Sequence, residues 1–575
     1  MRHFFLSAFF DAIRDGSLLR SGRPNIVAGL TVGIVALPLS MGLAIASGVP
    51  PQHGLYTAIV GGFVIAITGG SRVNISGPTA AFVVILLPVV QDYGLGGLLV
   101  SGALAGAILV GLGFLKVGRF IQTIPYPVVV GFTAGIGTVI ACLQLKDLLG
   151  LTPEPGGIHF IARATSYAAA IHTFQWQETL LGISTLLVIF LWKRIDSPIP
   201  GYLVALLCGT VISYLFNLSD ALPGVETIAD RFSYSVDGVA HAGIPPMAPS
   251  WRLPWLLPGP DGNPIGLSFE LVHALFGAAF SIAILGALES LLCAVVADGM
   301  TGEQHNPDTE LIGQGIGNLV VPFFGGIPVT AAIARTALNV RTGGSTPLAA
   351  IVHSLFLLVA VLLLARALSL VPMAAMAAVL VAVAWNMSEF KHVVHLVKKA
   401  PRPDVAVFAV CYGLTVLVDM QIAITAGLVL AAVMFIRRMS ELSTVAPLTA
   451  HDEQRHPEKR PGMVIYDVNG PLFFGAAHKA LKVILSVDHQ IRSVVLDMAD
   501  VPAIDTTAMV NLRSISELLD RRNIRLYVIN AQDRIEQKMR RFGVNEGESK
   551  LAFIESLDLV DTAADAPFVR PEDAR

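Results

Sequence analysis

Runs of about 20 apolar residues, repeated along most of the chain, constrain the fold more than any other feature of this sequence. A bilayer core about 30 Å thick needs roughly 20 apolar residues in one α-helix. Such runs fill residues 25–440, separated by short polar or Pro- and Gly-rich segments. Only 14% of the residues are charged, against about 25% in an ordinary soluble domain. The sequence therefore predicts an all-α polytopic membrane domain.

We predict about fourteen membrane helices in two sets of seven. The first set is expected near 25–48, 54–70, 76–91, 95–115, 126–149, 178–194 and 199–216. The second set is expected near 270–297, 308–324, 329–340, 346–368, 372–387, 403–418 and 421–438. Several of these spans are short for a bilayer, so their boundaries are good to a few residues only.

Lysine and arginine in the short loops indicate the orientation, because cytoplasmic loops carry more of them. With the N-terminus inside, the cytoplasmic loops hold Lys116, Arg119, Lys193, Arg194, Lys391, Lys398, Lys399, Arg402, Arg437 and Arg438. The long connection 217–269 is poor in both residues and falls outside. We expect a multi-pass protein of the bacterial inner membrane with both termini in the cytoplasm.

The two ends of the chain differ from the membrane domain. Residues 1–24 contain Asp11 and Asp15 and lack a small-residue cleavage site, so they predict an interfacial helix and not a cleaved signal peptide. Residues 441–570 are polar, and strand-like runs at 462–468, 493–499 and 524–530 alternate there with helical runs at 476–487 and 507–520. Such alternation predicts a cytosolic α/β domain with parallel strands.

Two segments interrupt the plain apolar helices. Residues 69–82 contain Gly-Gly and then SGPTAAF, and residues 325–335 contain Gly-Gly and then PVTAAIAR. Each holds the third place in its set of seven spans. Matched short segments interrupted by Gly and Pro indicate an inverted repeat with a binding site near the bilayer midplane.

A helix that starts inside the membrane directs unpaired N–H groups and the positive end of its dipole at the cavity. Two such starts facing each other would bind an anion. In the alternative interpretation, Pro78 and Pro328 only kink packed helices.

Charged residues inside a membrane are costly and therefore suggest function. Glu289 lies in the apolar run FGAAFSIAILGALESLLCAVVA, where burial favours the neutral acid, so it is a candidate carrier of a co-transported proton. Arg335 follows the second interrupted segment and is a candidate anion ligand. Alternatively, the two residues form a structural ion bridge. For Arg366 and Asp419, near span ends, we expect a snorkelling or capping role.

Several classes of function find no support in the sequence. The four cysteines show no metal-ligand spacing, so we expect no metal site, no cofactor and no disulfide framework. The net charge of −3 argues against a nucleic-acid partner. No GxxxxGK[ST] motif and no convincing nucleophile–base pair occurs, so we expect neither an ATP-driven pump nor an enzyme, and no catalytic residue is assigned.

Four segments of the membrane domain resemble the SulP family of anion transporters. They are LPLSMGLAIASGVPPQHGLYT at 37–57, SGPTAAF at 76–82, LGALESLLCAVVADGMTG at 285–302 and TAAIARTALN at 330–339. The tail motif at 494–508 is similar to the STAS domain with which this family ends. Several stretches, among them VAWNMSE, closely resemble a proton-coupled C4-dicarboxylate transporter of enteric bacteria.

The resemblance implies a seven-plus-seven inverted repeat with core and gate domains, homodimers and elevator-type alternating access. It also implies a substrate site between the third and tenth helix starts, lined by Thr79, Ala80, Ala334, Arg335 and Thr336. One departure is Leu39, where many family members have Gln or Glu, although Ser40 follows. This departure argues against sulfate, because a doubly charged oxyanion needs many donors.

In the tail, Thr506 and Thr507 stand where related regulatory domains carry a phosphorylated loop. The simpler interpretation is that these residues cap the following helix. Ala508 replaces a common glycine and weakens the switch interpretation. A cytosolic protein partner of this domain is a further expectation.

The sequence thus predicts a secondary anion transporter, driven by protons, for C4-dicarboxylates such as succinate or fumarate; sodium coupling is not excluded. A sulfate or bicarbonate transporter of the same family is the alternative. A channel, or an anion-responsive signalling receptor acting through the STAS domain, is the alternative from another class.

Overall fold

The computed structural model describes residues 7–557 except 122–123, 155–159, 193, 196, 198–199, 219–223, 237, 419, 448–461, 474–490, 545–550 and 555–556. The chain divides into two compact units, Met1–Leu428 and Val429–Arg575, each described by itself. Lys193, Asp419 and the predicted helical run 476–487 lie outside the described residues.

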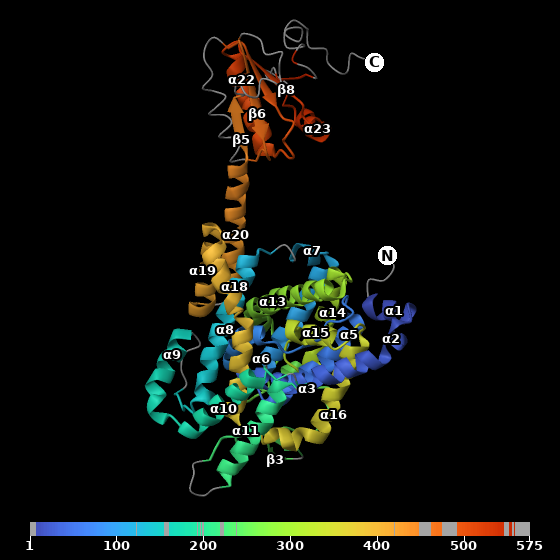
Figure 1. The fold of residues 1–575 in the computed structure, drawn as a ribbon, viewed down its shortest axis with the longest axis vertical. Coiled ribbons are helices and arrows are strands. Elements are labelled where there is room, and N and C mark those ends of the chain that lie inside the picture. The colour runs from blue at the N-terminus through green and yellow to red at the C-terminus, as the bar shows by residue number, and fades with distance from the viewer. Residues whose placement is uncertain are drawn as a thin grey trace. The chain divides into compact units, whose positions relative to one another are not determined.

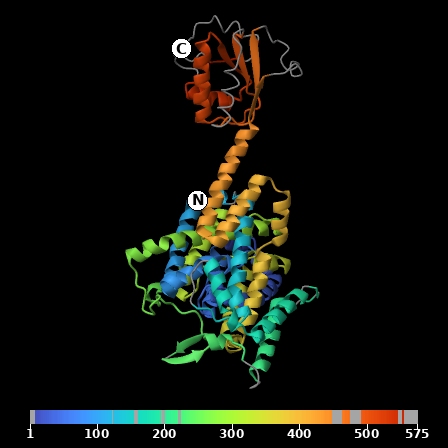
Figure 2. The same ribbon diagram turned by 90° about the vertical axis from the view of Figure 1, so that its left-hand side faces the viewer.

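Unit 1 is helical (Figures 1 and 2). Its first half contains α1 (Ser7–Arg14), α2 (Ser17–Arg20), α3 (Gly22–Ala46), α4 (Pro51–Tyr56), π-helix η1 (Thr57–Gly61), α5 (Gly62–Thr68), β1 (Ser76–Gly77), α6 (Ala80–Phe114), α7 (Gly118–Ile121), α8 (Tyr126–Leu148), α9 (Phe160–Ala169), η2 (Ala170–Thr173), α10 (Trp176–Trp192) and α11 (Gly201–Asn217). Its second half contains α13 (Phe269–Thr301), α14 (Pro307–Val320), η4 (Val321–Phe324), β4 (Thr330–Ala331), α15 (Ile333–Arg341), α16 (Leu348–Ser369), α17 (Met373–Met387), α18 (Phe390–Lys399), α19 (Arg402–Leu417) and the start of α20 (Met420–Leu442).

The predicted polytopic helical fold is confirmed. Seven helices of the described residues are long and apolar enough to cross a membrane, and α9 with α10 forms an eighth candidate that bends by 119°. Every predicted span coincides with a helix or a series of helical pieces. The spans expected at 76–91 and 95–115 are the two parts of α6, which breaks at Gly94 with φ 68°.

The helices of unit 1 pack in two groups. In one group α14 packs on α5 and α6, α13 packs on α6 and α15, and α16 packs on α3. In the other group α8 packs on α17 and α19, and α10 packs on α11 and α17. Figure 1 shows the first group around α3, α6 and α13, and the second around α8 to α11.

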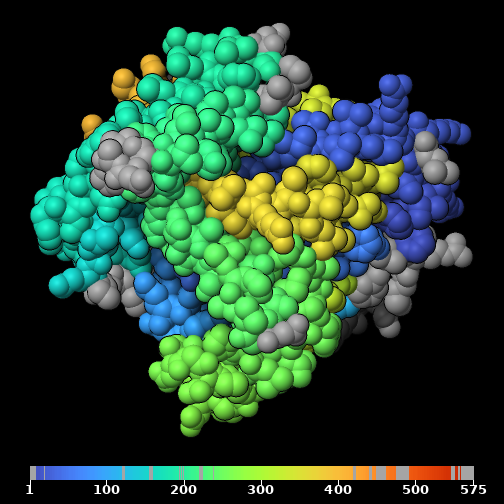
Figure 3. All heavy atoms as spheres, turned by 90° about the horizontal axis from the view of Figure 1, so that it is seen from below, coloured from blue at the N-terminus to red at the C-terminus, as the bar shows by residue number. Residues whose placement is uncertain are grey.

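The long connection between the two halves contains α12 (Ile228–Arg231), the antiparallel hairpin of β2 (Ser233–Val236) and β3 (Val239–Ala242), and η3 (Pro254–Leu256). Figure 3 looks onto the end of unit 1 where this green segment covers much of the surface beside the yellow α16. The connection therefore runs over the outside of the helices that it joins.

Unit 2 is an α/β domain, as predicted. Its sheet has the order β5 (Thr444–Pro447), β6 (Met463–Asn469), β7 (Ser493–Asp497), β8 (Arg525–Ile529) and β9 (Ala552–Phe553). The first pair is antiparallel and the other three pairs are parallel. The helices α22 (Thr506–Asp520) and α23 (Asp533–Arg541) follow β7 and β8.

Candidate anion site at two helix starts

Two very short strands join the interrupted segments that the sequence singled out. β1 pairs antiparallel with β4, with Ser76 opposite Ala331 and Gly77 opposite Thr330. α6 starts three residues after β1, and α15 starts two residues after β4. The pairing therefore brings the two helix starts together, as the inverted-repeat prediction requires.

Neither helix start is capped by a side chain. Thr79 is the N-cap residue of α6 and Ala332 that of α15, and neither makes a side-chain cap hydrogen bond. The first N–H groups of a helix have no partner within the helix, and they carry the positive end of its dipole. Two uncapped starts beside each other are suited to hold an anion.

Glu289 contacts the first of these starts. Thr79 Oγ1 donates a hydrogen bond of 2.8 Å to Glu289 Oε2 instead of capping its own helix. Thr79 is buried and Glu289, on α13, is half-buried. A titratable carboxyl group therefore lies directly at the start of α6.

Arg335 lies on the other side of the same turn. Its Nη2 donates to the carbonyl oxygen of Pro78, the residue before Thr79. Its Nη1 is buried and has no hydrogen-bond partner within the described part of the chain. A Cβ atom on Gly77 would lie 2.1 Å from this Nη1, so the guanidinium fills the space that glycine leaves open. Arg335 thus connects α15 to the backbone ahead of α6.

The predicted site residues fall into two classes. Thr79, Ala80 and the exposed Ala334 lie at the helix starts themselves. Thr336 is buried, and its Oγ1 accepts hydrogen bonds from the Ile75 N–H at 2.9 Å and from Cys293 Sγ at 3.1 Å. Thr336 therefore binds the protein backbone in this state, and its role as an anion ligand stays a prediction.

The structural ion bridge between Glu289 and Arg335 is not formed. Among the described residues, no ion pair within 4.0 Å connects these two side chains. They bind neighbouring residues instead, Arg335 at Pro78 and Glu289 at Thr79. The two side chains therefore do not satisfy each other's hydrogen-bonding groups.

Three buried polar residues of α14 form hydrogen bonds with β1 and with the segments that lead to β1 and β4. They are Glu310, Gln314 and Asn318, and they were not predicted from the sequence. Their spacing of four residues places them on one helix face. A polar stripe with this period in a membrane helix was the signal that would have identified them.

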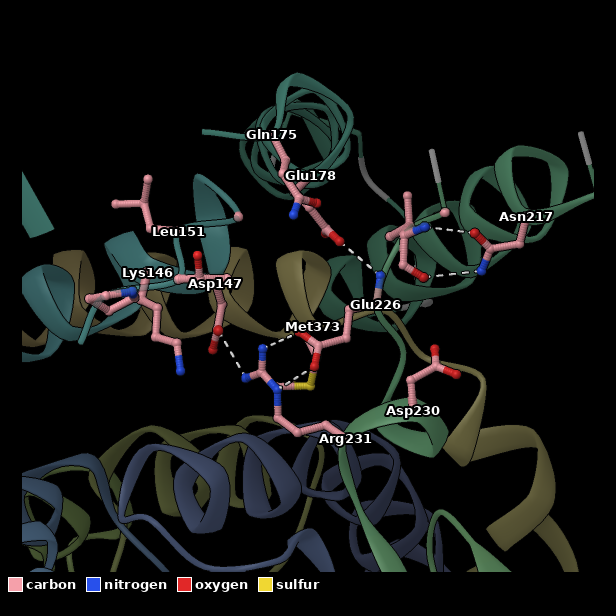
Figure 4. Close-up of a pocket in the computed structure, with 15 residues that line it drawn as sticks. Lys146, Asp147, Leu151, Gln175, Glu178, Asn217, Glu226, Asp230, Arg231 and Met373 are labelled. Atoms are coloured by element: carbon pink, nitrogen blue, oxygen red, sulfur yellow. Dashed lines mark hydrogen bonds and ion pairs between the residues drawn. The ribbon is translucent and has the colours of Figure 1, made fainter. Parts of the chain in front are cut away.

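A pocket of about 860 Å³ lies elsewhere in unit 1, between the ends of α8, α10 and α11 and the residues around α12 (Figure 4). In its wall Arg231 bonds Asp147 Oδ1 at 2.8 Å and Glu226 Oε1 at 2.9 Å. Burial alone would lower the pKa of Arg231, but the hydrogen bonds to Glu226 and the charge of Asp147 raise it above its ordinary value.

The charged residues lining this pocket are Lys146, Asp147, Glu178, Glu226, Asp230 and Arg231. Carboxylates outnumber cations four to two in that set, and Arg231 is already paired. The pocket is therefore unsuited to an anion, and the helix starts remain the better candidate.

In unit 2, Asp505 caps α22, because its Oδ1 accepts a hydrogen bond of 2.7 Å from the Ala508 N–H. Thr506 and Thr507 are exposed in the first turn of that helix. The capping interpretation therefore describes Asp505, and phosphorylation of either threonine stays a prediction.

Both parts of the chain are similar in sequence to known protein families. Residues 23–411 match the Sulfate permease family, and residues 455–558 match the STAS domain. The putative sulfate transporter YvdB of Bacillus subtilis is 36% identical over 548 residues, covering 94% of this chain and 98% of the relative. The bicarbonate transporter BicA of Picosynechococcus is 30% identical over 542 residues, covering 90% of each chain.

Solved structures agree in fold. A structure of SLC26A9 superposes with a TM-score of 0.81 at 17% identity, covering 96% of this chain and 92% of that one. The transmembrane domain of a cyanobacterial bicarbonate transporter BicA gives a TM-score of 0.59 at 27% identity, covering 72% of this chain and 97% of that one. The Bacillus and Picosynechococcus relatives are named for sulfate and bicarbonate, and neither is named for dicarboxylates.

Proposed function

The chain belongs to the sulfate permease family and is a multi-pass membrane transporter of anions, and on this premise we propose that it takes up C4-dicarboxylates together with protons. The site would lie at the starts of α6 and α15, with Thr79, Ala80, Ala334, Arg335 and Thr336 around it. The protein would act in the inner membrane of a bacterium with both termini in the cytoplasm.

The hydrogen bond between Thr79 and Glu289 is the observation that carries the coupling proposal. A carboxylate at this position repels an anion that approaches the start of α6, because both are negative and the surroundings are poor in water. A proton on Glu289 removes this repulsion. Anion and proton would then bind together and leave together, which is symport.

The preference for dicarboxylates rests on the first span and on the resemblance noted in the sequence. Leu39 is buried in an apolar cluster, where many family members have a polar residue. Leu39 and its apolar neighbours offer no side-chain donor, which suits a dicarboxylate, whose two charges are separated by apolar carbons, better than a compact dianion that needs donors on all sides. Ser40 is buried, and its Oγ lacks a partner among the described residues.

Bicarbonate or sulfate is the second candidate, because relatives at 30% and 36% identity carry these names. A monovalent bicarbonate would also need fewer donors than sulfate. To separate the candidates, the pH dependence of uptake is measured for each anion in the same preparation.

The two groups of helices support an elevator mechanism, in which the group around α3, α6, α13 and α14 carries the site past the other group. A related fold is known in an inward-facing state, in the murine anion transporter of Solute Carrier 26 family member A9 (TM-score 0.79). We propose the same alternation here, in a homodimer, with a cytosolic partner for unit 2.

Uptake of labelled succinate, sulfate and bicarbonate into proteoliposomes tests the proposal. We expect succinate to accumulate when the outside is acid, and a sodium gradient at equal pH to drive no uptake. Accumulation of bicarbonate or sulfate without succinate uptake would support the second candidate. No uptake of any anion, together with anion-dependent binding of a cytosolic protein to unit 2, would indicate a receptor.

A further inference from the structure

We propose that the polar stripe of α14, formed by Glu310, Gln314 and Asn318, is the positioning element that fixes the starts of α6 and α15 relative to each other. The inference deepens the proposed function, since it rests on the anion binding at those starts. The three residues follow one another at intervals of four on one helix face, and at most 1% of each is exposed.

Glu310 holds the segment that leads to β1. Its Oε2 accepts hydrogen bonds from the Gly70 N–H at 2.9 Å and the Ser71 N–H at 3.0 Å. Its Oε1 accepts from Asn74 Nδ2 at 2.9 Å and from Gln314 Nε2 at 3.0 Å. All four partners are donors, so an amide in place of this carboxylate would direct its own N–H₂ at a donor.

Gln314 and Asn318 continue the stripe to the strands. Gln314 Nε2 also donates to Ser76 Oγ in β1 at 3.1 Å. Asn318 forms a pair of bonds with Val329, the residue before β4: Oδ1 accepts from the Val329 N–H at 2.9 Å, and Nδ2 donates to its carbonyl at 2.7 Å. One face of α14 therefore binds the segment that leads to and enters β1 and the residue that precedes β4.

The fit between α14 and the first segment is close. A Cβ atom on Gly70 would lie 2.3 Å from the carbonyl oxygen of Asn306, and one on Gly313 would lie 2.6 Å from Cα of Gly69. The glycines let the segment lie directly on the helix, within reach of Glu310. Four residues of helix rise by about 6 Å, so α14 sets a fixed spacing between the bond of Gln314 to Ser76 in β1 and the bonds of Asn318 to Val329, just before β4.

The hydrogen bonds extend from the stripe to the second helix start. Cys293 Sγ, on α13, lies 3.5 Å from Asn74 Oδ1 and 3.1 Å from Thr336 Oγ1. Asn74 is one of the residues that Glu310 holds. Loss of Glu310 should therefore loosen the surroundings of Cys293 as well as the start of α6.

The first experiment measures anion transport by Glu310→Gln, with Asp308→Asn as the matched control. Asp308 is a buried carboxylate on the same helix, but its Oδ1 accepts a hydrogen bond of 3.2 Å from the Gly118 N–H in α7 and not from β1, β4 or the segments before them. We expect Glu310→Gln to raise KM at least tenfold with a smaller effect on kcat. Asp308→Asn should stay within twofold of the wild type in KM, and Glu310→Asp should recover part of the loss.

The second experiment does not depend on transport. In a Cys142→Ser, Cys208→Ser background, the labelling rate of Cys293 by a small maleimide reports how open the site is. We expect Glu310→Gln, and to a smaller extent Asn318→Asp, to accelerate labelling several-fold, and Asp308→Asn to leave it unchanged. Both Cys293 and Cys411 are buried, so mass spectrometry of the labelled peptide distinguishes them.

Equal KM in Glu310→Gln and the wild type, or equal shifts in Glu310→Gln and Asp308→Asn, would overturn the positioning role. If Glu310→Gln does not fold, Asn318→Asp decides in its place, because it keeps the acceptor for the Val329 N–H and loses the amide donor to the carbonyls of Val329 and Gln314. Failure of the wild type to transport succinate concerns the proposed function alone, because the variants are then compared with the anion that it does transport.

Discussion

Two residues next to each other, Pro78 and Thr79, hold the charged side chains of the candidate site apart. Arg335 binds the carbonyl of Pro78, and Glu289 accepts from the hydroxyl of Thr79. Because the guanidinium and the carboxylate do not pair with each other, each keeps part of its interaction capacity for a ligand. The anion and its proton would use these two groups.

Arg335→Ala should raise the KM for the transported anion while the protein remains folded. Losing one charge-assisted contact costs about 1.5–3 kcal/mol, which is about ten- to a hundredfold in affinity. Uptake kinetics in proteoliposomes measure the change. The exposed Arg366 on α16 provides the control, and an unchanged KM in Arg335→Ala would remove Arg335 from the site.

Glu289→Gln should keep exchange of anion between equal pools but lose accumulation driven by a proton gradient. Glutamine imitates the protonated acid permanently, so the anion still binds but no proton is released with it. Exchange and net uptake measured in the same vesicles separate the two activities. Net accumulation by the variant at acid outside pH would show that another group carries the proton.

Gly77→Ala should weaken anion binding much as Arg335→Ala does. Its Cβ atom would lie 2.1 Å from Arg335 Nη1, so the guanidinium must leave its place. The control is Gly299→Ala in α13, where a Cβ atom meets no heavy atom within 4 Å. A KM near the wild-type value in Gly77→Ala would mean that Arg335 adapts without loss, and that its present position is not required.

At the scale of helices and strands, the sequence predicted some elements around the site and missed others. The Gly-Gly and Pro signals predicted both half-helices, since these residues interrupt a helix wherever they fall. The pairing of β1 with β4 was not predicted, because strands of two residues carry no period-2 pattern. The α14 stripe was missed because the 308–324 span was identified by its apolar residues, and its three buried polar residues then received no separate role.

Arg231 joins the connection around α12 to the end of α8 by pairing with both Glu226 and Asp147. Arg231→Met should lower the apparent Tm, because it leaves the side chains of Asp147 and Glu226 unpaired in the wall of the pocket. Arg231 is 23% exposed and Asp147 13%, so we expect about 1–2 kcal/mol, between a surface and a buried pair. Thermal unfolding in detergent measures the change in Tm, with Arg366→Met as the control. Equal Tm values for Arg231→Met and the wild type would show that the ion pairs of Arg231 add no stability.

At the scale of the whole molecule, the membrane domain and the sheet domain have separate hydrophobic cores. The clusters of unit 1 and those of the sheet domain share no residue. The polar composition of residues 441–570 was enough to predict a second domain from the sequence.

Removing residues 445–575 should reduce expression or rate and leave the choice of anion unchanged. The helices of unit 1 satisfy their backbone hydrogen bonds within themselves, as helices in a membrane must, so the membrane domain should still fold. Competition of unlabelled succinate, sulfate and bicarbonate against labelled substrate measures selectivity. A changed order of competition would show that unit 2 takes part in the pathway.

The four neutral donors around Glu310 also have an electrical consequence. The formal charges of Glu310, Arg335 and Glu289 are −1, +1 and −1, so the empty site has a formal charge of −1. In the proposed elevator cycle, an inside-negative membrane potential would drive that empty site outward, by up to about 2.3 kcal/mol per 100 mV. The voltage would then act on the return of the unloaded carrier, and respiring cells would reset it faster than de-energised ones.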